Sequence, residues 1–239
     1  MSARPSSTIE PAAASHAAAT RTPKAAAASA RAPRKVGLYA VLIAVVVIVG
    51  IVAVVVSRNG GTKTTAFELG MVTVAGTPLP ALPDGAASDP AAGMAAPAIT
   101  GTTFDGKAET ITPGAGPMLV MFVAHWCPHC QREVPLVTSW LKASVIPTDV
   151  TLRAVATATS STLPNYPPSA WLAKAKFPIT TIADDEANAA AAAYGLTSYP
   201  YFVALDKTGK VVTRASGELT QAQFEGLITA ARTGRAAAA

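Results

Sequence analysis

The longest apolar stretch of the chain runs from residue 36 to residue 56 and contains no charged side chain. As an α-helix, its 21 residues would measure about 31 Å at ~1.5 Å per residue, which matches the roughly 30 Å core of a bilayer. A helix buried in a soluble domain would show a polar face, and this stretch shows none. It also exceeds the apolar region of about 7–15 residues in a cleaved signal peptide. The pattern therefore predicts an uncleaved transmembrane anchor over residues 36–56.

The charges around this stretch indicate how the anchor is oriented. Residues 1–35 carry six basic side chains and one acidic side chain, so the formal net charge of +5 resides before the span. Positive flanks stay in the cytoplasm, which predicts a single-pass protein of the cell membrane with a cytoplasmic N-terminus and an extracytoplasmic C-terminal part. The tail is rich in Ala, Ser, Thr and Pro and lacks aromatic residues. Its composition predicts disorder and no nucleic-acid partner.

Beyond the span, the pattern becomes that of an α/β domain. Residues 57–93 are expected to form a polar linker and an N-terminal extension with one short strand. The continuous apolar run over residues 118–124 is typical of a central strand buried on both faces. Helical spacing of apolar residues follows from about residue 128 to residue 141. Pro135 lies inside this helix and should kink it.

The rest of the chain continues the alternation of strands and helices. Because a single core suffices for this length, we expect one folded domain over residues 94–234 and a disordered tail over residues 235–239. Thr220 is the expected N-cap of the last helix. The predicted elements are a strand within 104–117, a strand over 150–159, helices over 167–177 and 185–196, a hairpin over 201–216 and a helix over 219–232.

Both cysteines of the chain, Cys127 and Cys130, lie in the motif "HWCPHCQREVP". A closed zinc site needs four ligands, and the chain has only two cysteines. Covalent haem attachment needs a histidine directly after the second cysteine, where Gln131 stands. A purely structural disulfide would close a ring too short to gain much loop entropy. A pair between a buried strand and a helix is instead typical of a redox site, because the helix N-terminus favours a thiolate at the first cysteine. Cys127 is then the nucleophile and Cys130 the resolving thiol.

This motif, with "YGLTSYPYFVALDKTGKVV" and "SGELTQAQFEGLI", resembles the thioredoxin-fold proteins over about residues 94–233. Among them it is similar to the membrane-anchored, TlpA-like thiol-disulfide oxidoreductases. The resemblance implies a central mixed sheet flanked by helices and no cofactor beyond the redox-active disulfide. It also implies protein thiols or disulfides as substrates, and a membrane or extracytoplasmic redox partner. The implied site around the cysteines consists of Trp126, Pro128, His129, Glu133, Tyr199 and the cis-proline Pro200.

The motif leaves the direction of electron flow open. The Pro128–His129 dipeptide is typical of oxidising, DsbA-like proteins, and a charged His129 would stabilise the Cys127 thiolate. In TlpA-like reductases an acid at the position of Glu133 is thought to assist proton transfer at the resolving thiol. We therefore expect a reduction potential between about −270 mV and about −120 mV. Replacing His129 by Gly should make it more negative.

A binding protein is the alternative to an enzyme. Soft thiolates suit Cu(I), so the same fold could carry copper on Cys127 and Cys130, with His125 or His129 as a further ligand. Metal carriers of this family usually have a distal histidine after the pair, and no histidine follows His129. The sequence thus favours the oxidoreductase with no metal site, and it leaves the substrate open between cytochrome c maturation and general oxidative folding.

Overall fold

The computed structural model describes residues 66–236, apart from residues 84, 86–87 and 144–146. The predicted tail and the predicted transmembrane span, residues 1–56, lie outside this part of the chain. Among the described residues, no helix is both long enough and apolar enough to cross a bilayer.

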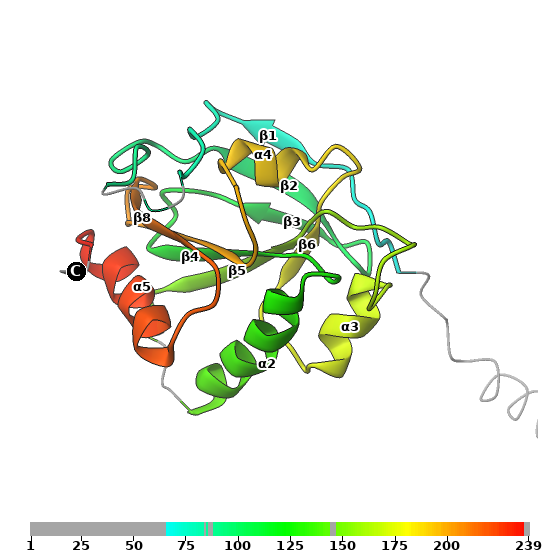
Figure 1. The fold of residues 1–239 in the computed structure, drawn as a ribbon. Helices are drawn as coiled ribbons and strands as arrows, with labels where there is room; N and C mark the ends of the chain where they lie inside the picture. Colours follow the sequence, from blue (N-terminus) through cyan, green and yellow to red (C-terminus); the bar gives the residue numbers. More distant parts are fainter. Residues whose placement is uncertain (1–65, 84, 86–87, 144–146, 237–239) are drawn as a thin grey trace, which may run out of the picture. The chain divides into compact units, whose positions relative to one another are not determined.

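A mixed β-sheet forms the centre of the domain, with strand order β1-β2-β6-β5-β4-β7-β8 and β3 paired to β2 (Figure 1). The central strand β4 runs parallel to β5 and antiparallel to β7. Every residue of β4 is buried, as the apolar run predicts. The strands are β1 (Thr73–Ala75), β2 (Ala98–Thr103), β3 (Ala108–Ile111), β4 (Met118–Val123), β5 (Thr151–Ala156), β6 (Thr181–Ala183), β7 (Tyr201–Leu205) and β8 (Val211–Ser216).

Helices cover both faces of the sheet (Figure 1). They are α2 (Pro128–Ala143), α3 (Pro168–Lys174), α4 (Ala189–Ala193) and α5 (Gln221–Thr233). Because successive side chains of a strand point to opposite faces, β4 contributes to two cores. Its odd-numbered residues pack in one cluster with α2, α3 and α5, and its even-numbered residues pack in another with α4. The site-bearing helix α2 therefore lies on a sheet that is covered on its other side.

Most of the predicted elements are confirmed. The helix predicted from residue 128 to residue 141 extends to Ala143 with Pro135 inside it. The hairpin of β7 and β8 turns at Gly209, whose φ of 81° favours glycine. Thr220 caps α5 in a capping box with Gln223, as its position predicts.

Two strands, β2 and β6, were missed by the pattern. β2 carries Gly101, where a Cβ would come within 2.7 Å of a methyl group of Ile182, so only glycine lets the two strands approach. β6 is three residues long, too short to show an alternation of its own. Only pairing with neighbouring strands defines these elements.

The described part of the N-terminal extension packs against the same sheet. β1 pairs with β2, and Leu79 and Ala91 belong to the core on the α4 face. Arg214 on β8 has a fully buried side chain and forms an ion pair of 2.5 Å with Asp89. Its guanidinium also donates to the carbonyl oxygen of Pro80 at 2.8 Å. Tertiary contacts that the sequence pattern cannot reveal thus tie the extension to the domain.

Candidate active site

The two thiols lie where β4 ends and α2 begins. Cys127 directly precedes the helix, and its carbonyl oxygen accepts the N–H of Gln131 at 3.0 Å. Cys130 lies one turn further on, where its Sγ accepts the N–H of Ala124 at 3.5 Å. Cys127 is 6% exposed and Cys130 is fully buried. Cys127 is therefore the more accessible of the two thiols.

The loop before β7 forms the opposite wall of the site. The peptide bond between Tyr199 and Pro200 is cis, as the resemblance implies. The Sγ of Cys127 lies 3.8 Å from the carbonyl oxygen of Tyr199 and can donate to it. The ring of Trp126 packs edge-on against Tyr199, with centroids 5.8 Å apart. The indole N–H of Trp126 donates to the carbonyl oxygen of Ala158 at 2.7 Å, so both aromatic walls of the site are fixed.

Cys130 and Glu133 form a buried acidic pair one helical turn apart. Burial raises the pKa of the Cys130 thiol well above its usual range. Glu133 is also fully buried. Burial raises the pKa of its carboxyl from 4.5 to about 7, although the N–H of Leu219, which donates to Oε1 at 3.2 Å, opposes the rise. The other oxygen, Oε2, has no hydrogen-bond partner.

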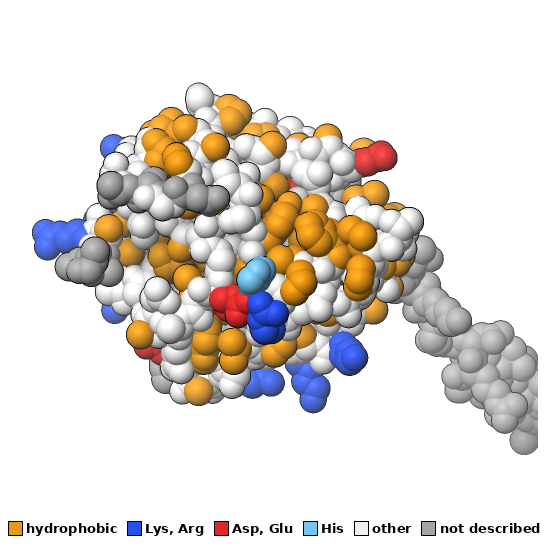
Figure 2. All heavy atoms as spheres, viewed as in Figure 1, with side chains coloured by type: hydrophobic (Ala, Val, Ile, Leu, Met, Phe, Trp, Pro, Cys, Tyr) orange, Lys and Arg blue, Asp and Glu red, His pale blue; other side chains and the backbone are white. Residues whose placement is uncertain are grey.

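His129 and Pro128 are exposed at the start of α2. The Nδ1 of His129 lies 2.6 Å from Oε1 of Glu218, and Arg132 binds the same carboxylate through Nε and Nη2. On the face shown in Figure 2, a histidine lies against an acidic and a basic side chain, with apolar side chains beside them. Sequence reasoning missed Glu218, which is 89 residues from His129.

His125 has a structural environment that the motif alone did not reveal. It is 1% exposed, and both of its ring nitrogens bind backbone of the loop between β5 and α3. Nδ1 donates to the carbonyl oxygen of Pro164 at 2.7 Å, and Nε2 accepts the N–H of Ser160 at 3.1 Å. No ring lone pair is left for a metal. Within the described ranges, no group of three or more His, Cys, Asp or Glu side chains could hold a metal ion. The engagement of both ring nitrogens argues against His125 as a copper ligand.

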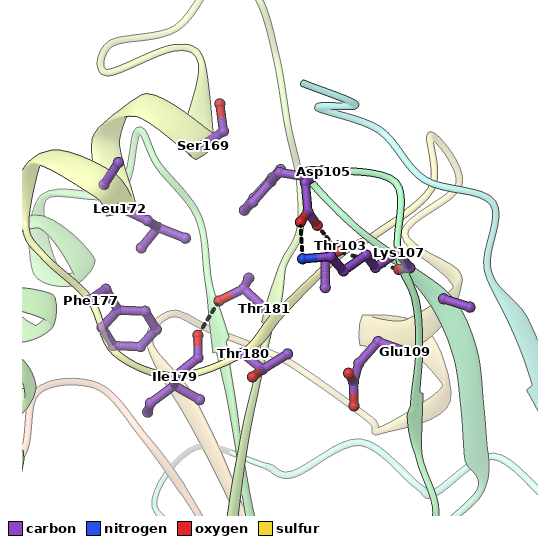
Figure 3. A pocket seen from close by; sticks show the side chains of 13 residues that line it. Thr103, Asp105, Lys107, Glu109, Ser169, Leu172, Phe177, Ile179, Thr180 and Thr181 are labelled. Carbon is purple, nitrogen blue, oxygen red and sulfur yellow. Dashed lines mark hydrogen bonds and ion pairs between the residues drawn. The ribbon is translucent and has the colours of Figure 1, made fainter. Parts of the chain in front are cut away.

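A cavity of about 540 Å³ lies away from the cysteine motif, between α3, β6 and the turn joining β2 to β3 (Figure 3). Lys107 forms an ion pair of 2.7 Å with Asp105 at its wall. None of its lining residues comes from the cysteine motif or from the cis-proline loop. This cavity is therefore separate from the two thiols.

Fold and site together define a thioredoxin-like α/β domain that presents a Cys-x-x-Cys pair at the N-terminus of a helix. The chain belongs to the Redoxin family, whose model matches residues 91–228.

Solved structures resemble the chain in fold. A hypothetical protein, SMc02350 from Sinorhizobium meliloti 1021, has a TM-score of 0.53 and 16% identity, covering 62% of this chain and 87% of its own. A putative thiol:disulfide interchange protein DsbE from Chlorobium tepidum has a TM-score of 0.48 and 21% identity, over 59% and 96% of the two chains. StoA from Bacillus subtilis has a TM-score of 0.46 and 19% identity, over 54% and 95%. No curated protein sequence matches.

Proposed function

We propose that this protein is a membrane-anchored, extracytoplasmic thiol-disulfide oxidoreductase that exchanges disulfides with other proteins through Cys127 and Cys130. The observation that carries the proposal is the unequal burial of two thiols at one helix start, beside the cis-Pro200 loop of a Redoxin-family domain. Such a site needs no bound cofactor, because the cysteine pair itself takes up and releases two electrons.

The exchange proceeds through a mixed disulfide. In the reducing direction, the Cys127 thiolate attacks a substrate disulfide, one substrate thiolate leaves, and Cys127 becomes linked to the other substrate sulfur. Cys130, as thiolate, then attacks the Sγ of Cys127, which releases the second substrate thiolate and leaves the pair oxidised. In the oxidising direction the same steps run backwards, starting from the disulfide of the pair and a substrate dithiol. The cis-proline loop beside Cys127 offers backbone groups to a substrate chain.

Glu133 supplies the proton chemistry at Cys130. The buried thiol must lose its proton before it can attack, and burial opposes this loss. A carboxylate whose pKa is about 7 can take up that proton near neutral pH and return it in the reverse direction. Its oxygen Oε2, which has no partner, is available for the transfer, directly or through one water molecule.

The anchor and the partners follow from the sequence. The uncharged stretch over residues 36–56, with positive charge before it, supports an anchor that holds the domain on the extracytoplasmic side. There the substrates are protein thiols or disulfides, and a membrane or extracytoplasmic redox partner returns the pair to its starting state. Detergent should extract the full chain from membranes, whereas carbonate should not. On intact cells, the C-terminal domain should be accessible to added protease. A chain released by carbonate would contradict the anchor.

A trapping experiment tests the activity. The full chain in detergent, reduced and freed of reductant, is mixed with a peptide disulfide, and the released peptide thiol is measured. The Cys130→Ser variant should stop at a mixed disulfide with Cys127, seen as the mass of one peptide half, while the Cys127→Ser variant should release no thiol. The metal content of the reduced protein is measured in parallel. Stoichiometric copper together with no thiol release would favour the metal carrier instead.

A further inference from the structure

The histidine of the Cys-Pro-His-Cys motif is bound by an acidic residue of another element. Glu218 lies in the loop between β8 and α5, and its Oε1 is 2.6 Å from Nδ1 of His129. The same carboxylate accepts from Nε of Arg132 at 3.0 Å and from Nη2 at 2.5 Å. Both basic side chains of the first two turns of α2 thus converge on one carboxylate beside the cysteine pair.

Two of the contacts in this cluster exclude each other. Nδ1 of His129 can donate a proton to Glu218, or it can accept one from Nη2 of Arg132, which lies 3.0 Å away. The contact with the carboxylate is shorter and has an ionised acceptor, so it is the stronger of the two. Donation to Glu218 directs the proton of Nδ1, and with it the positive charge of a protonated ring, towards the carboxylate.

We propose that Glu218 is a positioning residue that holds His129 and Arg132 and offsets their charge, so that the Cys127–Cys130 disulfide is a weaker oxidant than its Pro-His dipeptide alone would make it. This inference rests on the proposed function, since it concerns the potential of the same cysteine pair. The Pro-His dipeptide is typical of oxidising proteins, whereas the domain resembles TlpA-like reductases. Glu218 would be the residue that moderates the oxidising effect of the dipeptide.

The position of Glu218 in the chain reinforces this assignment. The next residue, Leu219, donates its N–H to Oε1 of Glu133 at 3.2 Å. One loop therefore carries both the carboxylate that binds His129 on the surface and the donor that holds the buried acid. The thiolate of Cys127 is close enough to Arg132 to help raise the pKa of its guanidinium, after the larger effect of Glu218. A change at Glu218 should therefore alter the charge around the cysteine pair.

The sign of the effect follows from charge. In the equilibrium with glutathione, the oxidised pair plus two glutathione thiols gives the reduced pair plus one glutathione disulfide, and only the reduced pair can carry a Cys127 thiolate. Removing the Glu218 carboxylate leaves Arg132 unpaired near this thiolate, which favours the reduced pair. Removing Arg132 instead takes away one positive charge near this thiolate and leaves the carboxylate with His129 as its remaining partner, which disfavours the reduced pair. The two variants should therefore shift the equilibrium in opposite directions.

The test measures this equilibrium constant for the full chain in detergent at pH 7. Glu218→Gln should raise it about tenfold, which corresponds to about 30 mV. Arg132→Gln should lower it several-fold. Asp149→Asn is the matched control, because it removes the carboxylate of another exposed ion pair, with Arg232, at the opposite end of the sheet. It should leave the constant unchanged.

Two outcomes would overturn the inference. One is that the wild-type protein equilibrates with glutathione and that Glu218→Gln and Arg132→Gln both have the same equilibrium constant as the wild type. The other is a shift of both variants in the same direction, which would indicate a merely structural effect. If Glu218→Gln fails to fold, the sign of the Arg132→Gln shift decides alone. A wild-type protein that exchanges no disulfide at all would instead refute the proposed function, so the two failures are distinguishable.

Discussion

Replacing Glu133 by Gln should change the pH dependence of stability in a way that the structure specifies. The carboxyl has a pKa of about 7 in the folded protein, against 4.5 ordinarily, because it is buried. A buried carboxyl with a raised pKa binds a proton more tightly in the folded state. Ionisation of this carboxyl therefore costs no stability below pH 4.5, and it costs progressively more stability as the pH rises towards 7.

The size of this effect follows from the same shift. Each pKa unit corresponds to about 1.4 kcal/mol, so the ionised carboxylate destabilises the wild-type protein by at most about 3 kcal/mol above pH 7. Glutamine keeps the oxygen that accepts the N–H of Leu219 but carries no charge. The Glu133→Gln variant should thus match the wild-type protein near pH 4 and exceed its free energy of unfolding by up to this amount at pH 8.

Urea unfolding of the reduced protein at a series of pH values measures the difference. Comparing the two proteins at each pH cancels the titration of all other groups. Glu186→Gln is the control, because it makes the same replacement at an exposed glutamate. In the Glu133→Gln variant, the release of substrate from the mixed disulfide should also slow, since no carboxylate remains to accept the proton of Cys130. A stability difference independent of pH would refute the assignment of a raised pKa.

Three further changes have defined outcomes. Limiting alkylating reagent should label the reduced protein at Cys127 before Cys130, as peptide mapping by mass spectrometry would show, and preferential labelling of Cys130 would contradict the order of exposure. Asp89→Asn leaves the buried guanidinium of Arg214 without its ion-pair partner and should lower the free energy of unfolding by about 3–5 kcal/mol, whereas a loss below about 1 kcal/mol would contradict the burial of this pair. Thr220→Ala removes the N-cap of α5 and should lower it by about 1 kcal/mol in urea titrations, while an unchanged midpoint would count against the cap.

The elements predicted from sequence are those whose signal is local. The strand β4 is a continuous apolar run, and the start of α5 is marked by Thr220 together with Gln223 three residues later. β2 and β6 lack such a signal, because Gly101 interrupts one and the other has three residues. They exist as strands through their partners in the sheet, which a local pattern does not contain.

The site divides in the same way. The cysteines and their immediate neighbours lie together in the motif, and the resemblance adds the cis peptide bond before Pro200. Glu218 and the backbone partners of His125 come from segments 35 to 89 residues away. No spacing rule connects them to the motif. The sequence therefore names the thiols, and the fold is needed to name the groups that tune them.

The ion pair between Asp89 and Arg214 has a practical consequence for preparing this domain. A fragment starting at residue 94, where the sequence suggests that the domain begins, would lack Asp89 and the carbonyl oxygen of Pro80, both partners of the Arg214 guanidinium. It would also lack Leu79 and so expose the core residues that pack in the same cluster. Such a fragment should be prone to aggregate during expression. A version cut just before Ala66 retains these contacts and is the better starting point for crystallisation without the apolar N-terminal stretch.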